Sequence, residues 1–225
     1  MKIKGYLTPI LCLPLLLLIF VNGTAAMWFN EVKLASRSLF CNSLHFSSTV
    51  YVVNQRNNVD QDRENLLHQG RVLFYEAVED KSKIASAVDI FQQIIQLDKV
   101  YEGRALTYLG ALTALKGKHA FLPHQKLKLV KQGLTLMDNG MAMSADDVEA
   151  LFVHGSTCYY LPSFFRRGDD AQRDFKKILR ILPAQMQAYD IALIDNVLKF
   201  MVEHAALDAN EREYIRQLKM KRLHK

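Results

Sequence analysis

The sequence predicts an all-α protein in which antiparallel helical hairpins stack against one another. Three observations support this fold class. From Asp60 onward, apolar residues recur at steps of three and four, which places them on one face of a helix. The predicted helices are separated by short breaks, which force neighbouring helices to run antiparallel. A pattern of helix, turn and helix at residues 146–183 also appears twice upstream in a shorter, looser form.

Composition limits the kind of partner. The chain has 225 residues, of which 50% are hydrophobic, so it can bury a sizeable core. Charged residues make up 23%, and the formal net charge is +6. Its lysines and arginines are not interleaved with aromatic residues in the way of proteins that bind single-stranded nucleic acid. We therefore interpret the basic excess as a solvated surface and expect no nucleic-acid partner.

Residues 1–26 have the pattern of a secretory signal peptide. Lys2 and Lys4 form a positive start, residues 10–21 form an apolar run, and residues 24–26 are small enough for a cleavage site. The apolar run is shorter than the ~20 residues that cross a bilayer. The pattern resembles bacterial signals and predicts a periplasmic or secreted protein, with an uncleaved anchor as the less favoured alternative. We expect membrane contact only through this segment, before its cleavage.

Residues 27–59 form a predicted N-terminal arm and linker. Residues 32–44 have the spacing of an amphipathic helix. Residues 47–53 are β-branched and aromatic, which predicts an extended segment, and residues 54–58 have the composition of a linker. We interpret the arm as packing on the first helices. The alternative is an exposed strand that pairs with another chain.

Three cysteines are present, and Cys12 lies in the signal segment. Cys41 and Cys158 can either form one disulfide bond in an oxidising compartment or remain two separate buried thiols. We favour the separate thiols.

The first two predicted hairpins occupy residues 60–97 and 101–140. In the second, Gly110 lies in mid-helix, where Gly costs ~1 kcal/mol relative to Ala, so we expect a close helix–helix contact there. Gly117 and Gly140 are interpreted as residues at helix ends. Pro123 suits the first turn of the following helix.

The third predicted hairpin spans residues 144–183. Ser144 is the expected N-cap of its first helix, followed by acidic residues in the first turn. Residues 161–162 end that helix, Gly168 begins its partner, and Pro183 stops the partner. A seventh helix then runs through Met201.

The C-terminal end begins with a predicted capping box at residues 208–211. A polar, basic helix follows, as expected for the terminal unit of a stack. The predicted organisation is therefore a signal peptide at 1–26, an arm and linker at 27–59, a repeat domain at 60–204 and a capping helix at 205–225.

Two of the predicted second helices share one spacing. Their apolar residues fall at the same steps: Ala171, Phe175, Ile178 and Pro183 in one, and Ala87, Phe91, Ile94 and Lys99 in the other. Small residues also occur in the first helices at Gly110 and Gly155. This pattern resembles the tetratricopeptide repeat family over residues 60–183. Residues 161–167 lengthen one turn and the family's first-helix tryptophan is missing, so other helical-hairpin solenoids are the alternative.

The resemblance implies a short solenoid whose concave face, lined by the first helix of each hairpin, holds a peptide or a partner helix. Helical phase predicts the groove residues Arg104, Thr107, Glu149, Phe152, Ser156 and Tyr159. In the lengthened turn, Arg166 and Arg167 are candidates to hold a carboxylate, with a solvated turn as the alternative. The neighbouring aromatic residues Tyr159, Tyr160, Phe164 and Phe165 are either core between hairpins or an aromatic lip of the groove.

No catalytic, metal-binding or cofactor-binding motif is recognisable in the sequence. His119 and His124 are five residues apart across Pro123, which is poor metal-ligand spacing. We therefore expect a non-enzymatic adaptor that binds a protein or peptide partner, with no catalytic residue, metal or cofactor. The alternative is an accessory small-ligand-binding protein of a periplasmic solute-uptake system. A buried pocket behind the aromatic turn would favour that alternative.

Overall fold

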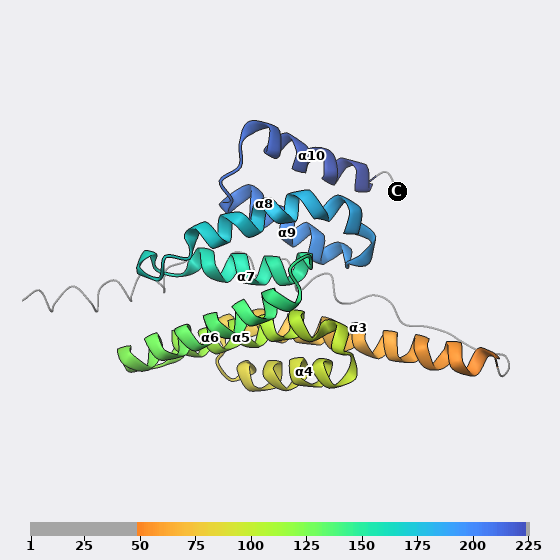
Figure 1. Cartoon of the computed structure of the whole chain (residues 1–225), viewed down its shortest axis with the longest axis horizontal. Coiled ribbons are helices and arrows are strands. Elements are labelled where there is room, and N and C mark those ends of the chain that lie inside the picture. The colour runs from red at the N-terminus through yellow and green to blue at the C-terminus, as the bar shows by residue number, and fades with distance from the viewer. Residues whose placement is uncertain (1–48, 224–225) are drawn as a thin grey trace, which may run out of the picture. The chain divides into compact units, whose positions relative to one another are not determined.

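The computed structural model describes residues 49–223, with side chains described for residues 60–220. This part of the chain contains eight α-helices, three short 3-10 helices and no strand, which confirms the all-α fold class (Figure 1). The α-helices are α3 (Thr49–Glu79), α4 (Lys83–Leu97), α5 (Glu102–His119), α6 (Pro123–Met143), α7 (Val148–Tyr160), α8 (Gly168–Gln185), α9 (Ile191–His204) and α10 (Ala209–Leu223). The 3-10 helices are Lys99–Tyr101, Ser163–Phe165 and Met186–Ala188.

Consecutive helices pack in pairs. α3 lies against α4, α5 against α6 and α7 against α8, each pair being joined by a short connection (Figure 1). α5 also contacts α3 and α4, and α7 contacts α5 and α6, so a first helix packs on the pair before it. α10 contacts α8 and α9 and follows the last of the predicted hairpins.

The apolar positions that share one spacing in the sequence are all fully buried. They are Ala87, Phe91 and Ile94 of α4 and Ala171, Phe175 and Ile178 of α8. Each phenylalanine ring packs against a glycine of the preceding helix. A Cβ added at Gly70 would lie 2.9 Å from the Phe91 ring, and one added at Gly155 would lie 2.9 Å from the Phe175 ring. The two rings also reach the following hairpin. Phe91 stacks on Tyr108 of α5 with 4.2 Å between centroids, and Phe175 lies 5.6 Å from Phe200 of α9.

α5 and α6 approach each other more closely than side chains of ordinary size would permit. A Cβ added at Gly110 would lie 2.5 Å from Met137 N and 2.6 Å from Gly133 O. Because these are backbone atoms, the helices would have to move apart to admit it. The predicted close contact at Gly110 is therefore confirmed.

Gly117 and Gly140 do not end helices, so this prediction is wrong. α5 continues to His119 and α6 to Met143. Both glycines are buried in the α5–α6 contact, where a Cβ at Gly140 would lie 2.6 Å from Gly103 O. Glycines spaced by seven residues lie on one helix face, and here that face is the contact between the two helices.

The predicted extended segment and linker at residues 47–58 are wrong over the part that is described. Helix α3 begins at Thr49 and continues through the asparagines to Glu79. No Gly or Pro occurs between residues 49 and 69, so the helical hydrogen-bond pattern meets no interruption. β-branched residues alone do not decide a strand, because their preference depends on what packs against them.

The ends of the third hairpin differ from the sequence-based expectation at two places. Asp147, rather than Ser144, caps α7, since its Oδ1 accepts a hydrogen bond from Ala150 N at 2.8 Å. The Ser144 hydroxyl instead donates to Gly140 O at the end of α6. Pro183 lies inside the last turn of α8, which ends at Gln185, because a proline removes one hydrogen bond without forcing an immediate stop.

The C-terminal capping box is confirmed. Asp208 N donates to Glu211 Oε2 at 2.9 Å, and Glu211 N donates back to Asp208 Oδ1 at 2.8 Å. The end of α7 at Tyr160 and the start of α8 at Gly168 also agree with the sequence-based expectation.

None of the helices in the described part of the chain is both long and apolar enough to cross a bilayer. The predicted signal segment, the predicted helix at 32–44 and Cys41 lie outside the described residues. Cys158 is a buried free thiol.

Candidate functional site

Four of the predicted groove residues are buried rather than open to a partner. Thr107 and Glu149 have no exposed area, Phe152 is 3% exposed and Arg104 is 8% exposed. Helical phase placed these residues on one face of α5 and one face of α7 and predicted that these faces line a groove. Those faces pack on neighbouring helices, so they do not form the open groove that the phase was taken to indicate.

Glu149 is the centre of a buried ion network between α3, α5 and α7. Arg71 of α3 donates from Nε and Nη2 to the two carboxylate oxygens, each at 2.7 Å. Tyr108 of α5 donates its hydroxyl hydrogen to Oε1 at 2.7 Å, and Arg104 Nη1 lies 3.2 Å from Oε2. Three helices of different hairpins are thereby joined at one carboxylate.

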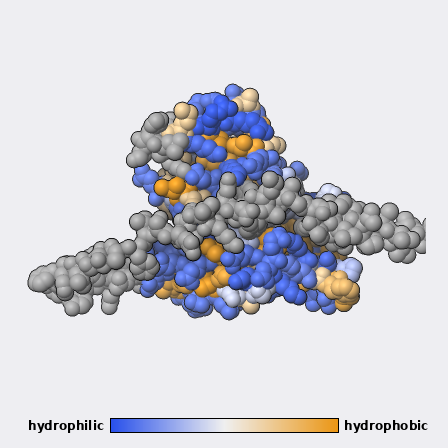
Figure 2. Space-filling model, turned by 180° about the vertical axis from the view of Figure 1, so that it is seen from behind, coloured by the Kyte–Doolittle hydropathy of each residue, from blue (hydrophilic) through white to orange (hydrophobic). Residues whose placement is uncertain are grey.

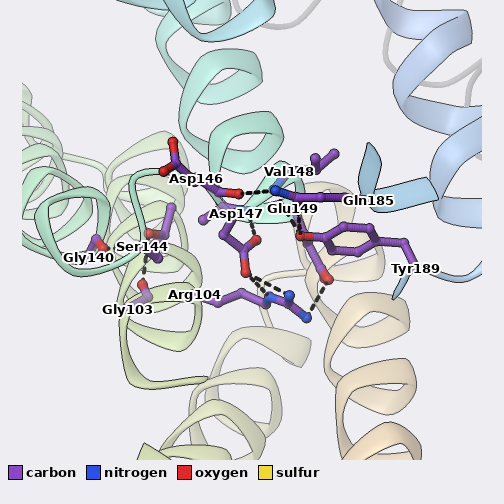
Figure 3. A network of polar contacts seen from close by, with 12 residues as sticks. Gly103, Arg104, Gly140, Ser144, Asp146, Asp147, Val148, Glu149, Gln185 and Tyr189 are labelled. Atoms are coloured by element: carbon purple, nitrogen blue, oxygen red, sulfur yellow. Dashed lines mark hydrogen bonds and ion pairs between the residues drawn. The ribbon is translucent and has the colours of Figure 1, made fainter. Parts of the chain in front are cut away.

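Arg104 joins this network to the start of α7 (Figure 3). Its Nε and Nη2 donate to Asp147 Oδ2 at 2.8 and 2.6 Å. The guanidinium also lies over the Tyr189 ring at 5.3 Å. The Tyr189 hydroxyl in turn accepts a hydrogen bond from Val148 N at 3.0 Å. Arg104 therefore has its donors engaged within the protein.

The network fixes the charge states of its members. Burial alone would raise the pKa of Glu149, but the ion pairs with Arg71 and Arg104 lower it to about 2. Burial raises the pKa of Tyr108 well above its ordinary value, which keeps the hydroxyl as a donor. An ionised glutamate whose oxygens are already bonded is a poor proton acceptor, so this network is suited to holding helices together rather than to acid–base chemistry.

The remaining buried groove residues also make internal contacts. The Thr107 hydroxyl donates to Gly103 O at 3.0 Å, and Phe152 packs edge-on against Phe200 with 5.4 Å between centroids. Ser156 is half-buried and donates to Val153 O at 3.3 Å. Each of these side chains therefore already has a partner within the protein.

A second polar cluster surrounds His154 of α7. Its Nδ1 lies 2.5 Å from Asp174 Oδ2 of α8, and its Nε2 lies 3.2 Å from Asp138 Oδ1 of α6 and 3.7 Å from Cys158 Sγ. Burial opposes protonation of the imidazole, but the bonds to Asp174 and Cys158 raise the pKa of His154 to about 10. This shift favours the protonated ring, which lies between the Asp174 and Asp138 carboxylates, with Arg167 Nη2 also 3.4 Å from Nε2. Since Cys158 is 1% exposed, its thiol is closed to a substrate.

The lengthened turn separates the two arginines that the sequence paired. Arg167 forms ion pairs with Asp138 and with Asp170, and so joins the His154 cluster. Arg166 is exposed and adopts a left-handed backbone conformation with φ 55°. Of the two, Arg166 is the one that presents its guanidinium to solvent.

Tyr159 and Tyr160 at the end of α7 and Phe164 in the following turn are all exposed, and we call these three residues the aromatic surface. Their exposed fractions are 38%, 42% and 65%. Both tyrosines pack against His204 of α9, at 5.1 and 6.1 Å between centroids, and Tyr160 also lies edge-on to Phe200. The two tyrosine rings therefore pack against α9 on one side and are partly exposed to solvent on the other.

An open groove of about 1120 Å³ lies between α3 and α4. Its walls carry amides and acids, which are Asn65, Gln69, Gln92, Gln93 and Gln96 with Asp62 and Asp89. The groove contains none of the predicted site residues. Among the described residues, no group of three or more His, Cys, Asp or Glu side chains is placed to hold a metal ion.

The sequence-based prediction missed the partners that complete the two polar clusters. By helical phase Arg71 falls among the apolar residues Leu67, Phe74 and Val78. Asp138 and Asp174 lie 16 and 20 residues from His154, on the helices before and after α7. A single charge inside an apolar stripe is the signal that points to Arg71, since a buried charge requires a partner. Which residue supplies that partner depends on how the hairpins pack.

Comparison of the chain with protein-family models, with curated proteins and with solved structures found no match. The described residues define the class of protein as all-helical, with helices packed in consecutive pairs. Its function is therefore argued from the surface and contacts of this chain alone.

Proposed function

We propose that this protein is a non-enzymatic helical-repeat adaptor that binds a protein or peptide partner. The aromatic surface carries the proposal. Tyr159, Tyr160 and Phe164 expose large rings together at the end of one hairpin, and exposed groups of this kind mark interaction sites on soluble proteins. Tyrosine and phenylalanine are also enriched at protein interfaces.

The packing beneath the aromatic surface makes it a firm platform. Tyr159 and Tyr160 contact one another and His204, and Phe200 lies beneath both. Rings held in this way lose little conformational freedom when a partner binds, which lowers the entropic cost of association. Arg166, exposed in the adjoining turn, supplies a charge for an acidic group of the partner.

The repeated packing of α4 and α8 supports the finer assignment to a solenoid that resembles tetratricopeptide repeats. In both helices the same three positions are buried, and the phenylalanine contacts a glycine of the helix before and an aromatic residue of the helix after. In solenoids, hairpins that repeat a contact in this way stack and present extended binding surfaces. The signal-peptide pattern of residues 1–26 supports a periplasmic or secreted location.

The small-ligand alternative has less support. It rests on a buried pocket behind the aromatic turn, whereas the groove described above lies between α3 and α4 and is open to solvent. An open groove favours an extended ligand over a small molecule, which is usually enclosed over most of its surface.

The test is capture of partners by the full chain from the native periplasmic or secreted fraction, with crosslinking and mass spectrometry. The double variant Tyr160→Ala/Phe164→Ala is expected to lose the specific partner, because it removes two exposed rings from the aromatic surface. The control is Val100→Ala, which truncates a side chain that is 86% exposed in the 3-10 helix before α5 and lies outside the aromatic surface.

Circular dichroism and thermal unfolding establish whether both variants keep the fold. Identical sets of captured proteins from the double variant, the control and the unmodified chain would refute the proposed use of the aromatic surface.

A further inference from the structure

The tip of the α5–α6 hairpin, residues 116–131, combines exposed apolar side chains with unpaired positive charge. Phe121 is 92% exposed, and Leu122 and Leu127 are each 40% exposed. In Figure 2, hydrophobic residues border hydrophilic ones at the end of this hairpin. A phenylalanine exposed to this degree contributes almost nothing to the protein's core, and together with Leu122 and Leu127 it makes the tip an apolar surface open to a partner.

Positive charge surrounds these apolar residues. Lys116, Lys126, Lys128 and Lys131 form no ion pair among the described residues. The chain has no aspartate or glutamate between Glu102 and Asp138. The hairpin tip is therefore cationic in its own sequence, and the acidic group that pairs with it, Glu79 of α3, engages Lys118. On α8, by contrast, Lys176 pairs with Glu211 and Lys177 with Asp146.

The tip is held in a fixed direction by the end of α3. The Lys118 ammonium donates to Val78 O at 2.7 Å, and it lies 3.4 Å from Glu79 Oε1. His119 Nε2 lies 3.1 Å from Ala77 O. The last turn of α5 is thus anchored to the neighbouring helix, which leaves Phe121 and Leu122 pointing beyond it.

The apolar and charged residues are arranged by depth. Lys116 precedes the end of α5 by three residues and Lys126 follows the start of α6 by three, so each lies about 5 Å behind the tip at ~1.5 Å per residue. The same order of depth occurs where a bilayer meets water, since apolar groups enter to ~5–10 Å and lysines reach back to the headgroups.

We propose that the hairpin tip docks on a membrane surface rich in anionic lipid, with Phe121 and Leu122 entering the headgroup–acyl boundary and the lysines contacting lipid phosphates. A convex apolar end flanked by lysines favours this partner over an acidic protein, which would require a complementary hollow. The inference extends the proposed adaptor function and does not depend on it.

The test measures whether the tip enters the bilayer, from the fluorescence of a tryptophan placed at position 121. Trp28 is the one tryptophan of the chain, so a Trp28→Phe/Phe121→Trp variant carries a single fluorophore at the tip. The full chain is mixed with vesicles of phosphatidylcholine, or of phosphatidylcholine and phosphatidylglycerol in equal parts, each with brominated acyl chains. A local signal is needed because the apolar residues 10–21 can bind bilayers by themselves.

We expect a blue shift and quenching of the tryptophan at position 121 with the anionic vesicles and neither with the neutral ones. The matched control is Trp28→Phe/Val100→Trp, which places the fluorophore at an exposed apolar position before α5, where the neighbouring Lys99 pairs with Glu102, away from the lysines of the tip. Its emission is expected to remain unquenched. Absence of quenching at position 121 would overturn the proposal and leave an acidic protein as the partner to seek. Equal quenching with both vesicle types would overturn the proposed selectivity for anionic lipid.

A second experiment tests the contribution of the lysines. One lysine near an anionic surface changes binding by about fivefold, so Lys116→Gln/Lys128→Gln/Lys131→Gln in the Phe121→Trp background should weaken the quenching titration on the order of 100-fold. The charge-matched control is Arg173→Gln/Lys176→Gln/Arg180→Gln, on the exposed face of α8. An equal loss in both triple variants would show general charge attraction and contradict a specific role for the tip.

Discussion

Glu149 is a buried charge that connects three helices. It has no exposed area, and its oxygens are bonded by Arg71, Tyr108 and Arg104. A buried ion is tolerated only when its partners replace the water it has lost. Removing the carboxylate would leave two arginines buried without their shared counter-charge. The residue therefore matters for stability, although it was predicted as a binding residue.

The variant Glu149→Gln is expected to lower the free energy of unfolding by ~3–5 kcal/mol, which is the range for breaking a buried ion pair at one partner. Urea unfolding followed by circular dichroism measures this loss. The control is Glu213→Gln on α10, where the carboxylate is 48% exposed and pairs only with a neighbour in the same helix. Its expected effect is below ~1 kcal/mol. Equal stability of the two variants would contradict the role given to the network.

At the scale of secondary-structure elements, α5 and α6 are held at a short distance by their glycines. Gly103 and Gly110 of α5 face Gly140 and Gly133 of α6, so a Cβ added at any of the four would lie 2.5–2.9 Å from a glycine carbonyl oxygen of the other helix. Close approach of this kind increases the contact between two helices. It also makes the pair sensitive to added volume, because the neighbouring atoms belong to the backbone.

We predict that Gly110→Ala destabilises the protein by ~1–3 kcal/mol, since the added methyl group would overlap Met137 N and Gly133 O. This sign is opposite to the ~1 kcal/mol gain that alanine gives in an unobstructed helix. Thermal unfolding distinguishes the two. Gly168→Ala at the start of α8 is the matched control, because nothing lies within 4 Å of its added Cβ, and it should not destabilise. A stabilised Gly110→Ala variant would show that the helices separate without cost.

At the scale of the whole molecule, the two buried clusters limit stability at opposite ends of the pH range. The folded state lowers the pKa of Glu149 from 4.5 to about 2, so its contribution is complete above 4.5 and is lost as pH falls towards 2. The folded state raises the pKa of His154 from 6.5 to about 10, so its contribution is complete below 6.5 and is lost as pH rises towards 10. Both contributions are present together only between these limits.

We therefore predict that the contributions of the two clusters are jointly greatest between pH 4.5 and 6.5. As pH rises from 6.5 towards 10, the imidazole loses its proton and the contribution of His154 to the free energy of unfolding is lost. Urea unfolding across this range measures the loss, and His154→Gln should abolish most of the alkaline dependence because glutamine does not titrate. An unchanged alkaline slope in that variant would assign the dependence to other groups.

The sequence by itself determined the features that depend on neighbours along the chain. Helical spacing, the capping box at Asp208 and the end of α7 at Tyr160 follow from local geometry and local hydrogen bonds. The buried positions of Phe91 and Phe175 followed from a shared spacing, and the close contact at Gly110 followed from a residue that an isolated helix would disfavour. Local reasoning was wrong at Gly117 and Gly140, which have the residue type of a helix end but lie in a contact with a second helix.

Only the tertiary structure decided which polar residues face another helix and which face solvent. Helical phase gives the direction of a side chain from its own axis, but it does not say what lies opposite. It therefore assigned Arg104 and Glu149 to a groove, whereas Arg71 and Asp147 from other elements enclose them. The partial exposure of Tyr160 depends in the same way on where α9 ends, because His204 at that end packs against its ring. A side chain's partner is fixed by the packing of helices distant in sequence, and their mutual placement is a property of the assembled fold.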